Sequence, residues 1–368
     1  MPVLVLPEDR KMQTLTSSRY AAALGVAALL AGCSAATGSQ VPATIGGAPA
    51  MHVFSKGTLV IAPGVRPNLE RQIVAAPLIR PNCCAREKVL FVTDSAGGSS
   101  FTGAVYAFDF KTGKELGQLP APPPTGWSLV QGACVDTAGN VYFANTNDSD
   151  LVEYSHSGTY LATLNDAERY PVGCAYDRTT GNLAVSNITD ASGGNGSISI
   201  FKNGVVQKTY YPIAMTSVYF VGYQDGTSIL WIDGKNSSGI FQYDKFANGA
   251  FTPVKITGGS IGFPGGVQWS AKTHIMNVGD QTASATPTVY QVSSTGRVVG
   301  STVLTCPEPS LCEFVQFAIK GARIVAPDAL NLNVQLYSYP AGGQPIGQYN
   351  AVEGYVLPIG AAVSPNVP

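Results

Sequence analysis

The chain has 368 residues, a net charge of −1, and charged side chains at only 12% of its positions. Such a composition offers no basic surface for nucleic acid, so we expect no nucleic-acid partner. Hydrophobic residues make up 45% of the chain, which is enough to bury a core and excludes a disordered protein. The 41 glycines and 25 prolines, with frequent Tyr and Val, favour many short strands joined by tight turns.

The first residues carry an export signal. Basic residues precede an apolar run at 21–31, and Gly32 separates that run from Cys33. The run is too short to span a bilayer comfortably. The sequence Leu-Ala-Gly-Cys at 30–33 resembles the lipobox of bacterial lipoproteins, which implies removal of residues 1–32 and lipidation of Cys33. The alternative is an ordinary signal peptide that contains a cysteine by chance.

The mature chain is expected to begin with a tether. Residues 33–80 hold the lipidated cysteine and a small, polar, proline-rich stretch that suits a flexible linker between a membrane and a domain. Acyl chains on Cys33 would attach the protein to the cell envelope. Ser34, in place of the Asp that retains some lipoproteins on the inner membrane, favours the outer membrane or the cell surface.

Between residues 81 and 366 one pattern returns every 42 to 51 residues or so, about the length of a four-stranded propeller blade. Its centre is an apolar, β-branched or aromatic run ending in Asn, Asp or Gly. The six copies lie at 89–94, 141–145, 183–187, 229–233, 275–279 and 324–328. A strand of small residues precedes each run from the second copy onward, and an aromatic strand and a final strand follow. The pattern predicts an all-β, six-bladed β-propeller of four-stranded antiparallel blades; a β-sandwich is the alternative, but it does not explain the period.

The two ends of the repeat region complete each other. The first unit lacks an inner strand, and residues 358–364 copy the inner-strand pattern found at 171–177. We therefore expect the C-terminal strand to pair into the first blade, which leaves the ring without an open edge.

The Pro-x-Gly start of the inner strands and the aromatic strand with its glycine hairpin resemble NHL-repeat propellers. Gluconolactonase- and regucalcin-like six-bladed propellers share this architecture, and the resemblance implies a metal held by Glu, Asn and Asp where inner strands begin. The matching positions here are Gln131, Val172, Gly265 and Ile359, with Glu313 as the one carboxylate. This departure argues against lactonase chemistry, so a metal-dependent hydrolase or lactonase is the alternative function.

We label the strands of a blade a to d from the channel outward. The a–b and c–d hairpins share one face of the ring (the a–b face), and the longer b–c loops and the d–a connections share the other (the b–c face). Short a–b turns are typical of structural hairpins, whereas long polar b–c loops are where a propeller would bind a carbohydrate, a peptide or an envelope protein. The polar residues expected around this mouth are Asp94, Asn145, Asn187, Asp233, Asp280 and Asp328.

The chemistry of this mouth has two interpretations. A ring of oxygen ligands would suit Ca²⁺ or Mg²⁺, whereas Asn and Asp also begin turns without any ligand. The three histidines, His52, His156 and His274, fall in the tether or in turns, where we expect solvated side chains and no catalytic triad. The sequence therefore favours a lipid-anchored binding or interaction scaffold.

Six cysteines remain after the lipidated one, an even number that suits disulfides in an oxidising compartment. Cys306 and Cys312 are placed to close a short loop in a d–a connection. Cys134 and Cys174 lie in inner strands of adjacent blades, where they either meet in one interface or point away on both sides. The pairing of Cys83 and Cys84 stays open.

Overall fold

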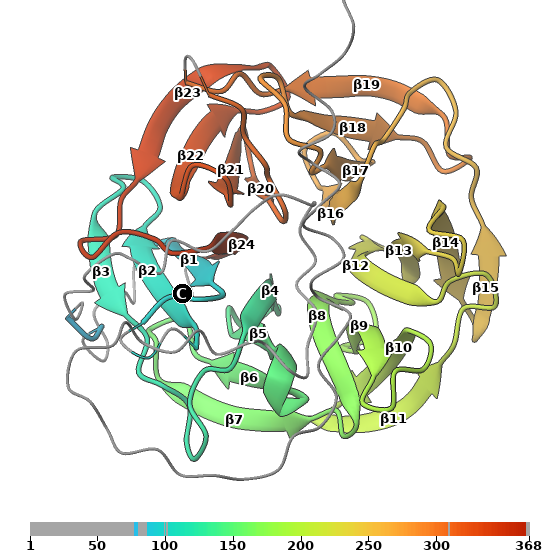
Figure 1. Cartoon of the computed structure of the whole chain (residues 1–368), viewed down its shortest axis with the longest axis horizontal. Coiled ribbons are helices and arrows are strands. Elements are labelled where there is room, and N and C mark those ends of the chain that lie inside the picture. The colour runs from blue at the N-terminus through green and yellow to red at the C-terminus, as the bar shows by residue number, and fades with distance from the viewer. Residues whose placement is uncertain (1–76, 80–86, 99, 101, 308–309, 366–368) are drawn as a thin grey trace, which may run out of the picture. The chain divides into compact units, whose positions relative to one another are not determined.

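The computed structural model describes residues 77–79, 87–98, 100, 102–307 and 310–365. The signal peptide, Cys33, most of the tether, Cys83 and Cys84 lie outside these residues. Within them the chain forms six four-stranded antiparallel sheets, which surround a central channel as blades (Figure 1). The one described helix is a turn of 3-10 helix, η2 (Thr146–Asp148). The predicted six-bladed all-β propeller is confirmed.

Each blade runs from strand a beside the channel to strand d at the outer rim. Blade 1 consists of β24 (Pro358–Ser364), β1 (Val89–Asp94), β2 (Ala104–Asp109) and β3 (Glu115–Gln118). Blade 2 consists of β4 (Val130–Val135), β5 (Val141–Asn145), β6 (Asp150–Tyr154) and β7 (Tyr160–Asn165). Blade 3 consists of β8 (Arg169–Tyr176), β9 (Leu183–Asp190), β10 (Ser197–Lys202) and β11 (Val205–Tyr210).

The last three blades follow the same order. Blade 4 consists of β12 (Ser217–Gln224), β13 (Ile229–Lys235), β14 (Phe241–Ala247) and β15 (Ala250–Pro253). Blade 5 consists of β16 (Pro264–Ser270), β17 (Ile275–Asp280), β18 (Thr288–Val292) and β19 (Val298–Val303). Blade 6 consists of β20 (Ala318–Lys320), β21 (Arg323–Asp328), β22 (Asn333–Ser338) and β23 (Gly342–Tyr349).

The ring closes through its last strand. β24 pairs with β1 in an antiparallel register that runs from Val89 opposite Ser364 to Asp94 opposite Pro358, as predicted. The Oγ of Ser364 also donates a hydrogen bond to the carbonyl of Gly139 in blade 2 (2.6 Å). The closing strand therefore completes blade 1 and contacts the blade that follows it.

One histidine differs from its sequence expectation. The sequence predicts a solvated His156, but this side chain is only 6% exposed and its Nδ1 lies 2.7 Å from the Oγ of Ser364. Its hairpin belongs to blade 2, so the side chain packs against the closing strand rather than against water. The expectation for His274 is correct, because that side chain is exposed in its turn.

Inner strands of neighbouring blades lie unusually close together. A Cβ added to Gly132 in β4 would lie 2.5 Å from the carbonyl oxygen of Val172 in β8. Backbone hydrogen bonds also join neighbouring blades directly, from Gly266 N–H to the Val315 carbonyl (2.7 Å). This approach explains why the inner strands are built from small residues. The larger side chains pack between blades, where Phe91 and Phe143 meet edge to face with ring centroids 5.9 Å apart.

Residues 77–79 extend blade 1 outward. Ile79 N–H donates to the Gln118 carbonyl (2.8 Å), and Gln118 N–H donates to the Pro77 carbonyl (2.9 Å), in a parallel pairing at the edge of β3. Ile79 is buried in the same hydrophobic cluster as Leu119. Composition assigns these residues to the tether, but composition does not show that one apolar side chain finds a packing site.

Candidate functional site

The six polar residues predicted around the b–c mouth all lie at or near the ends of strands b. Five of them, Asp94, Asn145, Asn187, Asp233 and Asp328, have no exposed surface, and Asp280 is half-buried. Buried polar groups of this kind need hydrogen-bond partners inside the protein. Their hydrogen-bond partners therefore show whether these side chains support the fold or are available to a ligand.

In five blades the strand-b side chain accepts hydrogen bonds from backbone N–H groups in or just before strand a of the same blade, at 2.6 to 3.1 Å. We call these five residues the strand-end acceptors. With their donors they are Asp94 with Val356 and Leu357, Asn145 with Ser128, Asp233 with Phe220, Asp280 with Gly262 and Phe263, and Asp328 with Glu313. The contacts hold each d–a connection against its own blade.

Blade 3 departs from this arrangement. The Nδ2 of Asn187 donates to the hydroxyls of Ser197 (3.3 Å) and Ser199 (3.0 Å), which lie on strand c instead of strand a. Pro171 lies opposite Asn187 in strand a and has no N–H to donate. The sequence pattern places all six residues at equivalent positions, but it does not show that one of them bonds to a different strand.

Burial raises the pKa of three strand-end carboxyls, those of Asp94, Asp233 and Asp328. It raises the pKa of Asp94 to about 6, although the three backbone N–H groups that contact the carboxyl act to lower it. Burial also raises the pKa of Asp233 well above its ordinary value, and only one backbone N–H opposes that effect. No described residue donates a hydrogen bond to Oδ2 of Asp233. The negatively charged forms of Asp94 and Asp233 are therefore less stable than those of surface carboxylates.

The acidic residues of this end do not converge on a metal site within the described part of the chain. No group of three or more His, Cys, Asp and Glu side chains there is placed to hold a metal ion. Glu313, the carboxylate singled out by the family resemblance, is buried next to Asp328. The ligand-binding role of the six mouth residues stays a prediction, and a backbone contact accounts for the recurrence of five of them.

A cavity of about 450 Å³ lies at the opposite end of the channel and is lined by all six inner strands. We call it the channel cavity. It opens on the a–b face, because its lining includes Arg178, Asp225, Lys272 and Gly321 from four a–b turns. The sequence indicates structural hairpins at these short turns and does not predict a site there.

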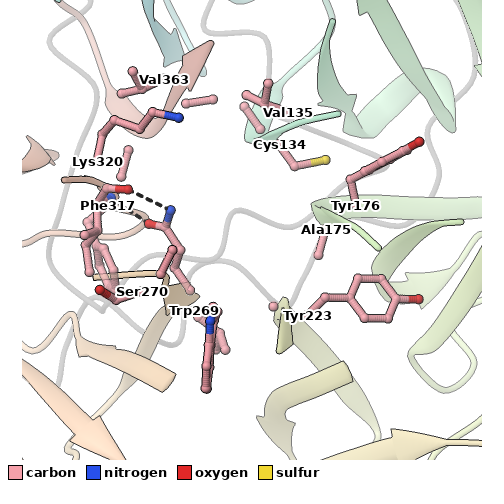
Figure 2. A pocket seen from close by; sticks show the side chains of 18 of the residues that line it. Cys134, Val135, Ala175, Tyr176, Tyr223, Trp269, Ser270, Phe317, Lys320 and Val363 are labelled. Atoms are coloured by element: carbon pink, nitrogen blue, oxygen red, sulfur yellow. Dashed lines mark hydrogen bonds between the residues drawn. The ribbon is translucent and has the colours of Figure 1, made fainter. Parts of the chain in front are cut away.

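Small apolar side chains leave space in the cavity wall, although polar atoms contribute more of its surface than apolar atoms do. These small side chains include Ala133, Val135, Ala175, Ala318, Ala361 and Val363. Figure 2 shows that the rings of Tyr176 and Tyr223 point away from the opening, so these two rings do not fill it. The cavity exists because the inner strands carry residues too small to fill the channel.

Two glutamine side chains join inner strands around the cavity. Gln316 accepts a hydrogen bond from the Ala133 N–H (3.0 Å) and donates one to the Ala133 carbonyl (3.3 Å), which links blade 6 to blade 2 past Gly360. Gln268 makes the same two-way contact with the backbone of Ile319 (2.6 and 3.2 Å). Each amide replaces a backbone peptide group, so the walls are held by hydrogen bonds as well as packing.

Both predicted disulfides are present. Cys134 and Cys174 join β4 to β8 in the wall of the channel cavity, with 5.5 Å between their Cα atoms. Of the two arrangements that the sequence leaves open, this pair therefore meets in one interface. Cys306 and Cys312 close a short loop in the d–a connection between blades 5 and 6, on the b–c face, with Cα atoms 5.9 Å apart.

Lys320 is the charged side chain that enters the cavity from an inner strand. It ends β20, is half-buried, and extends its ammonium group into the opening (Figure 2). Burial lowers the pKa of Lys320, and the positive charges of Arg178 and Lys88 lower it further. No sequence motif indicates this lysine. The signal that could have found it is a single charge at the end of a strand that is otherwise small and apolar.

Comparison with known proteins identifies the fold and no closer relationship. No protein-family model matches the sequence, and no curated protein matches it. The chain is similar to one chain of the crystal structure of a nidogen/laminin complex, with 11% identity and a TM-score of 0.59 over 76% of this chain and 100% of that chain. It is also similar to a protein of unknown function from Bacteroides caccae, with 12% identity and a TM-score of 0.53 over 76% and 99%. At these identities the likeness shows a shared six-bladed propeller fold.

Proposed function

We propose that the chain is an exported, lipid-anchored binding protein that receives a small ligand in the channel cavity. The observation that carries this proposal is the cavity of about 450 Å³ with a wall drawn from all six blades. Small-molecule sites usually occupy about 300 to 1,000 Å³ and combine apolar walls with a few polar groups. Lys320, Gln316 and Ser270 supply the polar groups here.

A matched pair of substitutions tests the cavity. Val135→Phe places a bulky phenyl ring in the cavity wall. Val205→Phe makes the same change on the outermost strand of blade 3, where Val205 is 62% exposed. A thermal-shift screen of small molecules should find ligands that stabilise the wild type and the Val205→Phe variant but not the Val135→Phe variant. Ligands that stabilise all three proteins equally would place binding elsewhere.

The sequence supports the export and the anchor. The apolar run at 21–31 is followed by the lipobox-like Cys33, and the two disulfides suit a compartment outside the cytoplasm. In the described residues no helix has the length and apolar character needed to cross a membrane. Cys33→Ser should leave the chain unprocessed or release it as soluble protein. A processed Cys33→Ser chain that still fractionated with membranes would contradict the lipid anchor.

A second candidate function is the docking of a peptide, a carbohydrate or an envelope protein on the b–c face. Several large apolar side chains are exposed there, among them Ile240 at 62%, Leu311 at 50% and Leu330 at 38%. Leu311 and Leu330 are held near each other, because Nδ2 of Asn331 donates a hydrogen bond to the Leu311 carbonyl. Capture of envelope components by the wild type, lost in a joint Leu311→Asp, Leu330→Asp variant and kept by Val135→Phe, would favour this second function.

A further inference from the structure

The lining of the channel cavity carries an excess of positive charge. Its lining contains three cationic side chains, Arg178, Lys272 and Lys320, and one acidic side chain, Asp225. In the part of the chain that the structure describes, the one salt bridge joins Arg169 to Asp166 in blade 3, so no carboxylate pairs with a cation of the cavity. Positive charge therefore collects at one end of a channel in a chain whose net charge is only −1.

Lys320 experiences this excess most directly. Its ammonium is half-buried and has lost part of its hydration, and the charges that act on it, those of Arg178 and Lys88, are of the same sign. Charges inside a cleft with low-dielectric walls interact more strongly than charges in water. An anion beside Lys320 would both relieve the repulsion and replace the lost hydration, whereas a neutral acceptor would only replace hydration and a cation would do neither.

The rest of the cavity wall indicates the size and chemical character of the ligand's body. Small apolar side chains such as Ala318, Ala361 and Val363 surround the opening, and the cavity is larger than a bare inorganic ion requires. The floor carries Gln316, whose amide is already bonded to Ala133. The wall thus leaves room for an organic body, which would contact these small side chains and the polar groups between them.

We infer that the channel cavity binds a small organic anion, and that Lys320 contacts its carboxylate or phosphate group. This inference rests on the proposed function, because it names the ligand class of the same cavity. The exposed Arg178 and Lys272 at the rim attract the anion, and Lys320 holds it. Charge-assisted hydrogen bonds from Lys to carboxylate or phosphate oxygens are stronger than neutral ones.

Three probes of similar size test the inference: benzoate, phenyl phosphate and benzyl alcohol, titrated by calorimetry into the full chain in detergent. Benzoate and phenyl phosphate separate the two anionic groups, and benzyl alcohol is the neutral match. At least one anion should bind with a Kd about tenfold or more below that of benzyl alcohol. Lys320→Met should remove about that tenfold preference, and Lys320→Arg should keep it.

The control substitution is Lys208→Met, which removes an exposed lysine from the outermost strand of blade 3. It should leave the binding of every probe unchanged. The inference is overturned when neither anion binds more tightly than benzyl alcohol, or when Lys320→Met binds the anions as the wild type does. If benzyl alcohol binds equally well and Val135→Phe abolishes that binding, the anion inference fails while the proposed function stands. If Val135→Phe leaves all binding intact, both fail.

Discussion

At the b–c end of the channel, buried carboxyl and amide oxygens accept hydrogen bonds from the backbone of their own blades, so most of these side chains have partners within the fold. At the a–b end, small side chains leave a cavity into which Lys320 projects beside other cations. Five of the six recurring polar residues that suggest a ligand site in the sequence also hold the backbone of their own blades. The cavity that we propose as a ligand site lies where the repeat leaves space and where Lys320 departs from the repeat pattern.

The two ends also differ in the sign of their electrostatics. At the b–c end burial raises the pKa of Asp94 and Asp233, so the fold favours their neutral forms. At the a–b end burial and neighbouring cations lower the pKa of Lys320. The first end relieves its desolvation with backbone N–H groups, whereas no carboxylate of the described chain pairs with the charge at the second end. This contrast predicts effects on stability that differ in size from one end to the other.

The largest effect is expected from a chain that ends at Gly354, because it lacks β24, which runs from one end of the channel to the other. The deletion exposes β1 and removes Ile359, Ala361 and Val363, all buried. Burial contributes about 25 cal/mol per Å² of apolar surface, so the free energy of unfolding should fall by about 5 kcal/mol or more, enough to abolish soluble protein. A chain ending at Pro365 should match the wild type in soluble yield and thermal midpoint. Equal behaviour of the two truncations would mean that β24 does not hold the ring closed.

The next largest effect on stability is expected from the disulfides, of which one lies at each end of the channel. Cys134 and Cys174 are separated by 40 residues and Cys306 and Cys312 by 6, so loop entropy gives about 4 kcal/mol for the first bond and about 2 kcal/mol for the second. Replacement of each pair by serines should therefore lower the urea midpoint more at the cavity end. The opposite ranking would show that the short loop, which packs against Ser284 and Ala285, depends on its bond for more than entropy.

Asp94 and Asp225 compare one acidic residue from each end. Asp94→Ala leaves the N–H groups of Val356 and Leu357 without their acceptor and should cost about 3 kcal/mol of unfolding free energy, whereas Asp225→Ala should change it by less than about 0.5 kcal/mol. Urea unfolding at pH 5 measures both. A similar cost for the two variants would remove the distinction between the ends.

The same aspartate predicts a pH dependence. Because burial raises the pKa of Asp94 from 3.8 to about 6, the folded chain holds more protons than the unfolded chain in that window. The contribution of Asp94 to stability is therefore full below pH 3.8 and falls by up to about 3 kcal/mol as the pH rises through 6. Asp94→Ala should lose that slope in urea midpoints taken from about pH 4 to 7. A slope that survives the substitution would assign it to other buried carboxyls.

The smallest effect is expected at Lys320. Since no described carboxylate pairs with its charge, Lys320→Met should alter the free energy of unfolding by less than about 1 kcal/mol, with a gain at low salt and no gain at high salt. Thermal midpoints at two salt concentrations measure this. A loss of the size expected for Asp94→Ala would make Lys320 a structural residue and end the contrast.

Most of the architecture could be predicted because it depends on local patterns. The apolar runs at strands b, the glycine turns and the copy of the inner strand at 358–364 define the blades and their closure. Both disulfide pairs could be proposed from blade geometry. The burial of His156 and the outward pairing of Ile79 could not, because each depends on a contact with a distant segment.

The candidate site was harder to predict for the same reason. The strand-end acceptors stand out in the sequence because they recur, but recurrence does not distinguish a backbone partner from a ligand. The channel cavity is defined by what its residues lack, namely bulk at Ala133, Ala318 and Ala361, and by one lysine with no counterpart in the other inner strands. No local pattern marks a space between six strands.

The strand-end acceptors have a consequence for how far such a chain can diverge. In five blades the contact requires a side-chain oxygen at one position, and it requires of the donor only a backbone N–H, which every residue except proline provides. Asp and Asn both meet this demand, as Asp94 and Asn145 do. The rest of the blade is free to change as long as it stays apolar where it packs. A ring held in this way depends on few fixed side chains, so it can keep its shape while most of its sequence changes.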